Sequence, residues 1–370
     1  MSTAASTNHA WDTCFWLLPK VSRTFALSIT ILPEPLSKAI CVGYLLCRLL
    51  DTIEDEPNLS LEEKAELIGS LRRGIEGIDA LPHDWHLMVA EHRLTGSSEH
   101  DVLLMRHLPE VLESFESLPA EVKPILVRCV HEMAVGMVEM QQVFATHRKQ
   151  VAALPSMDQL HRYCHYVAGT VGYMLTELFY LHSTDLAKNA YFELLERAES
   201  FGQYLQKINI LKDVRNDFAE GRLFIPLDAL QAAKLTPATL LEPNAAQSPL
   251  EAFSPVMLSV LHHARRAHEY LERMPVSDRP IRLFLGYSLY FGLETIALAL
   301  REPARLLDQA SRLKIGRLDV FGIVANLERC IDAPAALERH RQALIEKMRK
   351  HLHPDWPPAI SEAVAALNRA

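Results

Sequence analysis

Helical periodicity runs through almost the whole chain, and no other feature of the sequence restricts its fold as much. Apolar residues recur at spacings of three and four, and no alternating strand pattern is bounded by Asn-Gly or Asp-Gly turns. Glycine supplies only 14 of 370 residues, a scarcity that favours helix over sheet. No repeat of solenoid length is present. We therefore expect an all-α protein.

Prolines divide the pattern into predicted helices near 35–56, 61–77, 99–116, 121–147, 157–182, 187–219, 249–273, 280–303, 317–327 and 333–350. The segment 227–256 is rich in proline and has the weakest pattern, so it would also suit a linker. Candidate site residues nevertheless lie on both sides of residue 150, and they must come together to form one site. We therefore expect a loop within a single domain that covers residues 1–370.

Charge and cysteine usage narrow the functional classes. The formal net charge is −8 and no basic run exceeds two residues, which argues against a nucleic-acid-binding surface. The six cysteines form no CxxC pair and lie mostly in apolar stretches, as reduced core thiols do. The first residues lack a basic region followed by an apolar one. These features favour a cytoplasmic protein.

One stretch, 283–300, is long and apolar enough to cross a bilayer. It contains Glu294, and a carboxylate is costly in lipid. We interpret the stretch as a buried core helix and expect no transmembrane segment, with peripheral contact as the remaining form of membrane association.

The helix predicted at 35–56 is apolar until it ends in an acidic cluster. Asp51, Glu54 and Asp55 are spaced i, i+3, i+4 and share one face, and Pro57 places them at the helix C-terminus, where the macrodipole disfavours negative charge. The same stripe extends back to Arg48 and Tyr44. Taken alone, the cluster fits either a cation site or a solvated acidic helix end.

A second stripe repeats this arrangement. Gln206, Asn209, Asp213 and Asp217 follow one another at steps of three, four and four, and Gly221 ends the helix soon afterwards. Two carboxylate clusters of this kind fit Mg²⁺, which is usually completed by water and substrate phosphates. Cations that could contact phosphate oxygens directly are Arg23, Arg48, Lys212, Arg215 and Arg222.

A third segment, 161–179, combines polar and aromatic residues with small ones. Ala168, Gly169 and Gly172 allow another helix or an apolar ligand to approach closely, and the residue pattern leaves both options open. The pair His161 and His165 is spaced for zinc, but no third ligand is evident, so we interpret both histidines as structural or solvated. The apolar face of this segment consists of Val167, Val171, Leu175 and Phe179.

Several common motifs are missing: GxGxxG after a strand, GxxxxGK[ST], HExxH and GxSxG. A nicotinamide cofactor would therefore need a site other than a Rossmann fold.

Together these segments resemble the squalene/phytoene synthase family. DTIED (Asp51–Asp55) is similar to the first aspartate-rich motif of that family, and LQKINILKDVRND (Leu205–Asp217) to the second. SRTFALSI (Ser22–Ile29), YLLCRLLD (Tyr44–Asp51) and YCHYVAGTVG (Tyr163–Gly172) resemble its squalene synthase subgroup, and the likeness spans roughly 22–300.

The resemblance implies a single-domain isoprenoid-synthase bundle around a central apolar pocket, and a farnesyltransferase of the squalene synthase type. Two farnesyl diphosphates would condense with Mg²⁺ to presqualene diphosphate, and NADPH would reduce this to squalene, in an enzyme expected to be monomeric. The implied catalytic residues are Tyr163, Asp51, Asp55, Asp213 and Asp217, and the implied metal ligands are Asp51, Glu54, Asp55, Asn209, Asp213 and Asp217. The implied substrate-binding residues are Ser22, Arg23, Phe25, Tyr44, Arg48, Val167, Val171, Leu175, Gln206, Asn209, Lys212 and Arg222, and the implied NADPH contacts are Lys314 and Arg317.

Two positions depart from the family pattern. Asn216 stands where the second motif normally has Glu, and Gly316 stands where eukaryotic members have an Arg tied to NADPH. A related synthase that stops at presqualene diphosphate, or makes dehydrosqualene or phytoene without NADPH, is therefore the alternative. A non-catalytic helical lipid-binding protein is the alternative from another class.

Overall fold

The computed structural model describes residues 2–22, 24–146, 151–241, 249–308 and 313–368. The chain is 77% helical and 1% strand, which confirms the all-α prediction. It divides into two compact units, residues 1–142 with 173–184, and residues 143–172 with 185–370. The single domain and the central apolar pocket stay predictions.

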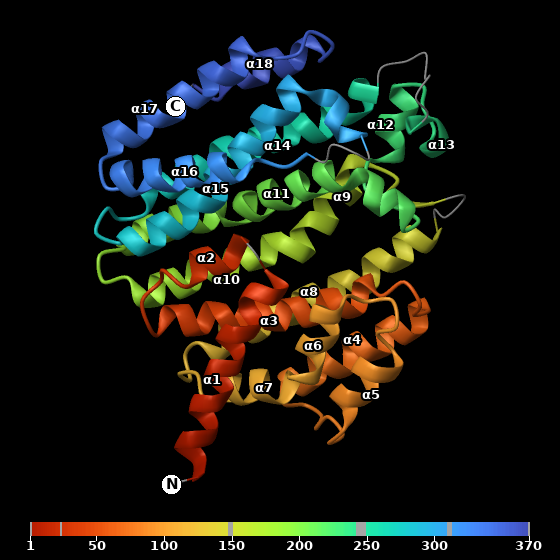
Figure 1. Cartoon of the computed structure of the whole chain (residues 1–370), viewed down its shortest axis with the longest axis vertical. Helices are drawn as coiled ribbons and strands as arrows, with labels where there is room; N and C mark the ends of the chain where they lie inside the picture. Colours follow the sequence, from red (N-terminus) through yellow and green to blue (C-terminus); the bar gives the residue numbers. More distant parts are fainter. Residues whose placement is uncertain (1, 23, 147–150, 242–248, 309–312, 369–370) are drawn as a thin grey trace. The chain divides into compact units, whose positions relative to one another are not determined.

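The first unit is built around helix α3 (Leu36–Asp55), which is buried along most of its length and packs against α1, α4, α6 and α7 (Figure 1). Its helices are α1 (Ser2–Val21), α2 (Thr24–Ile29), α3, α4 (Leu61–Ile75), α5 (Trp85–His92), α6 (Glu99–Arg106), α7 (Leu108–Glu116) and most of α8 (Lys123–Thr146) and α10 (Thr170–His182). Local signals set several boundaries. Ser60 and Glu63 form a capping box that begins α4, and the side chain of Ser98 caps α6.

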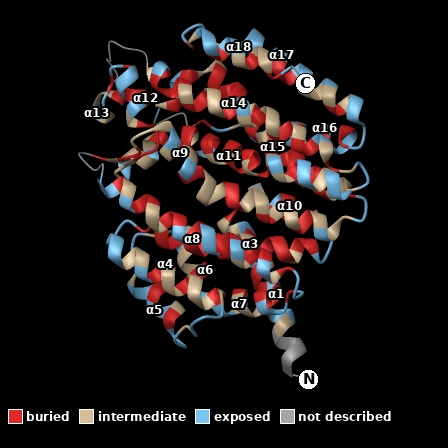
Figure 2. Cartoon of the chain, turned by 180° about the vertical axis from the view of Figure 1, so that it is seen from behind, coloured by how far each residue is buried: buried red, intermediate tan, exposed pale blue. Residues whose placement is uncertain are grey.

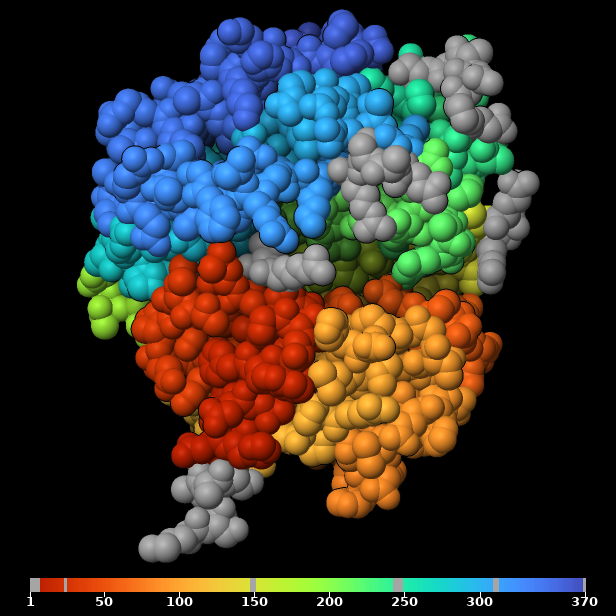
Figure 3. Space-filling model, viewed as in Figure 1, coloured from red at the N-terminus to blue at the C-terminus, as the bar shows by residue number. Residues whose placement is uncertain are grey.

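The second unit centres on α11 (Lys188–Ala219), which packs along α14 (Pro249–Arg273). Its other helices are α9 (Met157–Cys164), the π-helix η1 (His165–Gly169), α12 (Leu227–Ala232), α13 (Pro237–Leu240), α15 (Arg279–Arg301), the 3₁₀ helix η2 (Pro303–Leu306), α16 (Arg317–Cys330), α17 (Pro334–Lys350) and α18 (Pro358–Ala366). Strands β1 (Ala152–Ala153) and β2 (Arg222–Leu223) form one short parallel pair. The C-terminal helices, in blue, cover much of this unit in the face seen in Figure 3.

Helix α15 contains the stretch predicted to be a buried core helix. It is long and apolar enough to cross a membrane, but 89% of its most apolar window is buried inside the protein (Figure 2). Glu294 pairs with Lys347 of α17, so the carboxylate within the apolar run has a cation partner. The prediction of a core helix is confirmed.

Some elements differ from the predicted ones. The range 157–182 is interrupted by the π-helix, and 99–116 is two helices divided at His107. The segment 227–256 is not a plain loop, because it contains α12, α13 and the first turns of α14. Helices α1, α2, α5 and α18 were also not predicted. Helix α1 begins in a polar stretch whose periodicity is weak, and it is stabilised by packing on α3 and α7.

Candidate functional site

The first acidic stripe lies at the end of α3, where the sequence predicted it. Asp51 is half-buried and Asp55 is exposed. Burial raises the pKa of Asp51 to about 7; Arg48 opposes the shift, whereas Asp55, Glu54 and Asp101 add to it. Burial thus disfavours the charged form of this carboxyl more than Arg48 favours it.

Glu54 points away from this open side. Its side chain is 6% exposed, and its Oε1 accepts a hydrogen bond of 3.3 Å from Gln141 Nε2. Asp51 and Glu54 share a helix face but differ in exposure, because Gln141 of α8 covers the side of α3 that bears Glu54. Its predicted role as a metal ligand stays a prediction.

Arg48 is already paired in this structure. Its guanidinium donates to Asp101 Oδ1 from Nε at 3.1 Å and from Nη2 at 2.8 Å, and Thr52 Oγ1 approaches the same oxygen at 3.4 Å. Asp101 lies on α6 and was not predicted, because nothing in the sequence links it to a residue 53 positions earlier. Arg48 is thus held between Asp101 and Asp51, with its pKa raised by both carboxylates against the effect of burial.

The predicted residues near the start of the chain come together around Tyr44. Its hydroxyl donates to the Val21 carbonyl at 3.2 Å, and its ring lies 5.8 Å from that of Phe25. Ser22 Oγ accepts from the backbone N–H of Phe25 at 3.1 Å. Arg23 lies outside the described residues.

The second acidic stripe lies on the accessible side of α11. Asn209 is exposed and Gln206, Asp213 and Asp217 are half-buried, whereas Lys207 and Ile208 between them are buried. Lys212 Nζ donates to Asn209 Oδ1 at 3.3 Å. The helix ends at Ala219, and Gly221 has φ +80°, which suits glycine at a helix C-terminus.

The two stripes pass a chemical test for Mg²⁺. Each presents carboxylate oxygens at a helix C-terminus, where the macrodipole disfavours negative charge and a divalent cation would offset it. The predicted ligand residues therefore fit Mg²⁺ by their chemistry.

Tyr163 is enclosed by aromatic rings. It is 6% exposed, with the ring of Phe224 at 4.8 Å and that of Phe144 edge-on at 6.1 Å. These two phenylalanines come from the segment after α11 and from α8, and sequence reasoning missed them. Their π faces offer negative potential to a nearby cation.

The segment after Tyr163 forms the π-helix, a distortion that often marks functional sites. Two glycines bring it against α11. A Cβ on Gly172 would lie under 3.0 Å from the carbonyl oxygen of Ala198, and one on Gly202 equally close to that of Ala168. The small residues of this segment thus serve tight helix packing, which was one of the two options left by the sequence. The apolar side chains Val167, Val171 and Leu175 remain half-exposed.

A buried polar cluster lies beneath this crossing. Lys207 Nζ donates to Ser259 Oγ at 2.9 Å, and His161 Nε2 lies 3.3 Å from the same oxygen. Burial lowers the pKa of Lys207 to about 8, with Cys164 and Glu199 opposing the shift. His165 pairs with Glu199 at 3.2 Å, so both histidines of the predicted structural pair have protein partners.

The predicted phosphate and cofactor contacts in the second unit lie near its surface. Lys314 and Arg317 are exposed on either side of Gly316 at the start of α16. Arg222 pairs with Glu220 at 3.0 Å, and its guanidinium lies 5.9 Å from the centre of the Phe224 ring.

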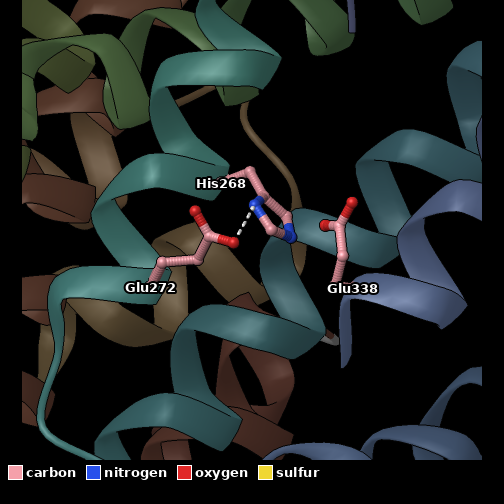
Figure 4. Close-up of side chains that lie close together, drawn as sticks. All are labelled: His268, Glu272 and Glu338. Atoms are coloured by element: carbon pink, nitrogen blue, oxygen red, sulfur yellow. Dashed lines mark ion pairs between the residues drawn. The ribbon is translucent and has the colours of Figure 1, made fainter. Parts of the chain in front are cut away.

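One further cluster contains a histidine and two carboxylates, His268, Glu272 and Glu338, whose candidate ligand atoms lie within 4.8 Å of one another (Figure 4). Its charges are already compensated. His268 Nδ1 lies 3.5 Å from Glu272 Oε1, while Arg341 donates to both oxygens of Glu338 at 2.6 Å. We interpret the cluster as an ion-pair network that joins α14 to α17.

Comparisons with known proteins show what the chain as a whole is similar to. A family model described as squalene/phytoene synthase matches residues 18–319. Squalene synthase of Bos taurus is 30% identical over 271 residues, which cover 73% of this chain and 59% of that protein. The match therefore spans less than two thirds of the relative.

Solved structures share the fold. The complex of TcSQS with the ligand BPH1237 has a TM-score of 0.80 at 20% identity and covers 97% of this chain and 96% of that one. A dehydrosqualene synthase in complex with a ligand has a TM-score of 0.60 at 18% identity, with coverages of 89% and 98%. The helical isoprenoid-synthase fold implied by the resemblance is therefore confirmed.

Proposed function

Because the chain belongs to the squalene/phytoene synthase family, we propose that it joins two farnesyl diphosphates head to head through presqualene diphosphate and releases squalene. The observation that carries the proposal is Tyr163, buried against Phe144 and Phe224 in the unit that also bears the second acidic stripe. A phenol within a cluster of aromatic rings suits a reaction that forms carbocations and moves a proton.

The acidic stripes would hold Mg²⁺, through Asp51 and Asp55 in one unit and through Asn209, Asp213 and Asp217 in the other. Glu54 would join the first set once it releases its hydrogen bond with Gln141. When bound, the metal neutralises diphosphate charge and makes it a better leaving group. Lys212 and Arg222 lie close to the second stripe in sequence and bind diphosphate oxygens directly. Arg48 does the same beside the first stripe once it exchanges Asp101 for substrate.

Tyr163 acts on the organic part of the substrate. The phenol relays the proton lost as the cyclopropane of presqualene diphosphate closes, because its oxygen takes that proton while its own O–H proton passes to the released diphosphate. The neighbouring aromatic faces stabilise the allylic cation that precedes this step. Val167, Val171 and Leu175 contact the prenyl chains and exclude water, which would otherwise capture the cation.

The second half-reaction uses a nicotinamide cofactor. Lys314 and Arg317, two exposed cations three residues apart, would hold the phosphates of NADPH, which when bound would supply a hydride for the reductive step. The enzyme acts as a monomer in the cytoplasm, where its contact with membranes is peripheral.

The test is product identification. The full chain is incubated with farnesyl diphosphate and Mg²⁺, with and without NADPH, and extracted products are identified by mass spectrometry. Squalene formed only with NADPH supports the proposal. Presqualene diphosphate or dehydrosqualene formed regardless of NADPH would support the alternative synthases, and the absence of any condensation would favour a lipid-binding protein.

A further inference from the structure

The amide of Gln203 ties α11 to the turn that leads into the π-helix. Its Nε2 donates to the His161 carbonyl oxygen at 2.8 Å and to Glu199 Oε1 at 3.1 Å. The side chain is 3% exposed. Both acceptors belong to the second unit, and one of them is a main-chain atom two residues before Tyr163.

The His161 carbonyl lies where the backbone hydrogen bonds change register. The N–H of His165 is shared between the carbonyls of Arg162 and His161, and further along the N–H of Thr170 donates to His165, as in a π-helix. A shared donor leaves the His161 carbonyl only partly satisfied. Gln203 supplies the second donor at the position where the helix widens.

Other contacts fix the same segment in place. Glu199, which accepts from Gln203, also pairs with His165 at 3.2 Å, the first residue of the π-helix. Gly202, adjacent to Gln203 in the chain, packs closely against the carbonyl of Ala168 in the π-helix. Residues 199–203, little more than one turn of α11, thus hold the π-helix.

From this geometry we propose that Gln203 is a positioning residue for Tyr163. By holding the His161 carbonyl it fixes where the π-helix begins, and hence the direction in which the Tyr163 side chain leaves the backbone towards Phe144 and Phe224. The phenol would otherwise lose its orientation while the fold persisted. This inference rests on the proposed function for its catalytic consequence only, since the effect on the backbone is independent of catalysis.

The test compares Gln203→Leu, which removes the donor at similar size, with a matched control on the same helix. Ser200 Oγ accepts from Arg266 Nε at 3.0 Å and contacts α14 instead of the π-helix, so Ser200→Ala removes one part-buried side-chain hydrogen bond of α11 elsewhere. We expect Gln203→Leu to lower kcat for the first condensation at least ~10-fold with little change in KM. Ser200→Ala should keep kcat near that of the wild type.

A second measurement does not depend on activity. Hydrogen exchange of a peptide covering residues 161–172 should become faster in Gln203→Leu and stay unchanged in Ser200→Ala. In a Tyr163→Phe background, Gln203→Leu should cause no further loss of rate, because it acts through that phenol.

Equal exchange of the peptide in all three proteins would overturn the inference, as would a kcat loss in Gln203→Leu no larger than in Ser200→Ala. An additive loss in the Tyr163→Phe background would likewise reject it. Failure of the proposed function would appear differently, as absence of condensation by the wild type, and the exchange experiment would still decide the effect of Gln203 on the backbone.

Discussion

A Cβ atom on Gly202 would lie under 3.0 Å from the carbonyl oxygen of Ala168, so α11 and the π-helix touch backbone to backbone. Because the obstruction is main chain, a larger residue cannot be accommodated by a change of rotamer. Gly202→Ala should therefore destabilise the protein by about 1–3 kcal/mol and lower activity by displacing the segment that carries Tyr163. Urea unfolding and a condensation assay measure the two effects.

The control for this change is Gly322→Ala. Gly322 lies within α16, and nothing lies within 4 Å of the position of its Cβ. That substitution should stabilise the helix by about 0.5–1 kcal/mol and leave activity unchanged. Equal stability of Gly202→Ala and the wild type would contradict the packing argument.

Replacing Asp51 should raise the stability of the protein and lower its activity. Burial and neighbouring acids raise the pKa of Asp51 to about 7 from an ordinary value of 3.8. The folded state therefore binds more protons than the unfolded state between these values, and its stability falls as pH rises through them. Asp51→Asn should raise the Tm of the metal-free protein, more at about pH 8 than at about pH 4.

The same change should cut turnover by at least ~10²-fold, about 2.7 kcal/mol of barrier, and Asp213→Asn should do likewise. Turnover with Mg²⁺ and differential scanning fluorimetry check both parts, with Glu62→Gln on the exposed start of α4 as the control. Full turnover in the presence of EDTA would rule out the metal role.

The Tyr163 phenol should matter for rate and not for binding. Tyr163→Phe keeps the aromatic packing against Phe144 and Phe224 and removes the hydroxyl that relays the proton, so the first condensation should slow at least ~10²-fold at unchanged KM. Tyr191→Phe, which removes a phenol at the start of α11, serves as the control. If Tyr163→Phe forms presqualene diphosphate at the wild-type rate, the proposed role of Tyr163 is wrong, and Tyr166 and Tyr44 are the next phenols to test.

Lys207 should give the protein a pH-dependent stability above neutrality. Its pKa falls from 10.5 to about 8 because the ammonium is buried. The unfolded state then binds more protons between these values, so stability rises with pH across this window. Relative to Lys207→Met, the wild type should gain about 2 kcal/mol between about pH 7 and about pH 9.5.

Urea unfolding of the two proteins at both pH values measures this gain, and the difference cancels the titration of every other group. If the free energies of unfolding of the two proteins changed equally with pH, the buried amine of Lys207 would not be the source of the pH-dependent stability.

Lys314 should act only in the reductive half. Lys314→Ala should leave the first condensation intact and let presqualene diphosphate or unreduced C30 products accumulate when NADPH is present. Lys350→Ala, at the exposed end of α17, is the control for loss of a surface cation. A product spectrum of the wild type that does not respond to NADPH would refute the cofactor role.

The sequence alone determined the helical class and the local placement of the acids. Spacing along a helix follows from 3.6 residues per turn, so Asp213 and Asp217 share one side of α11 as predicted. The end of α3 at Asp55 followed from Pro57 in the same way. Such features depend only on residues that are close in the chain, so they can be predicted from the sequence.

Only the tertiary structure decided which side of each stripe is open and what surrounds it. Glu54 is buried by Gln141, Arg48 is paired with Asp101, and Phe224 covers Tyr163. These partners lie far apart in the chain, and each pairing depends on how helices cross. The helix crossing at Gly202 and Ala168 has no pattern along the sequence, because close packing of two backbones is a property of the pair and not of either segment.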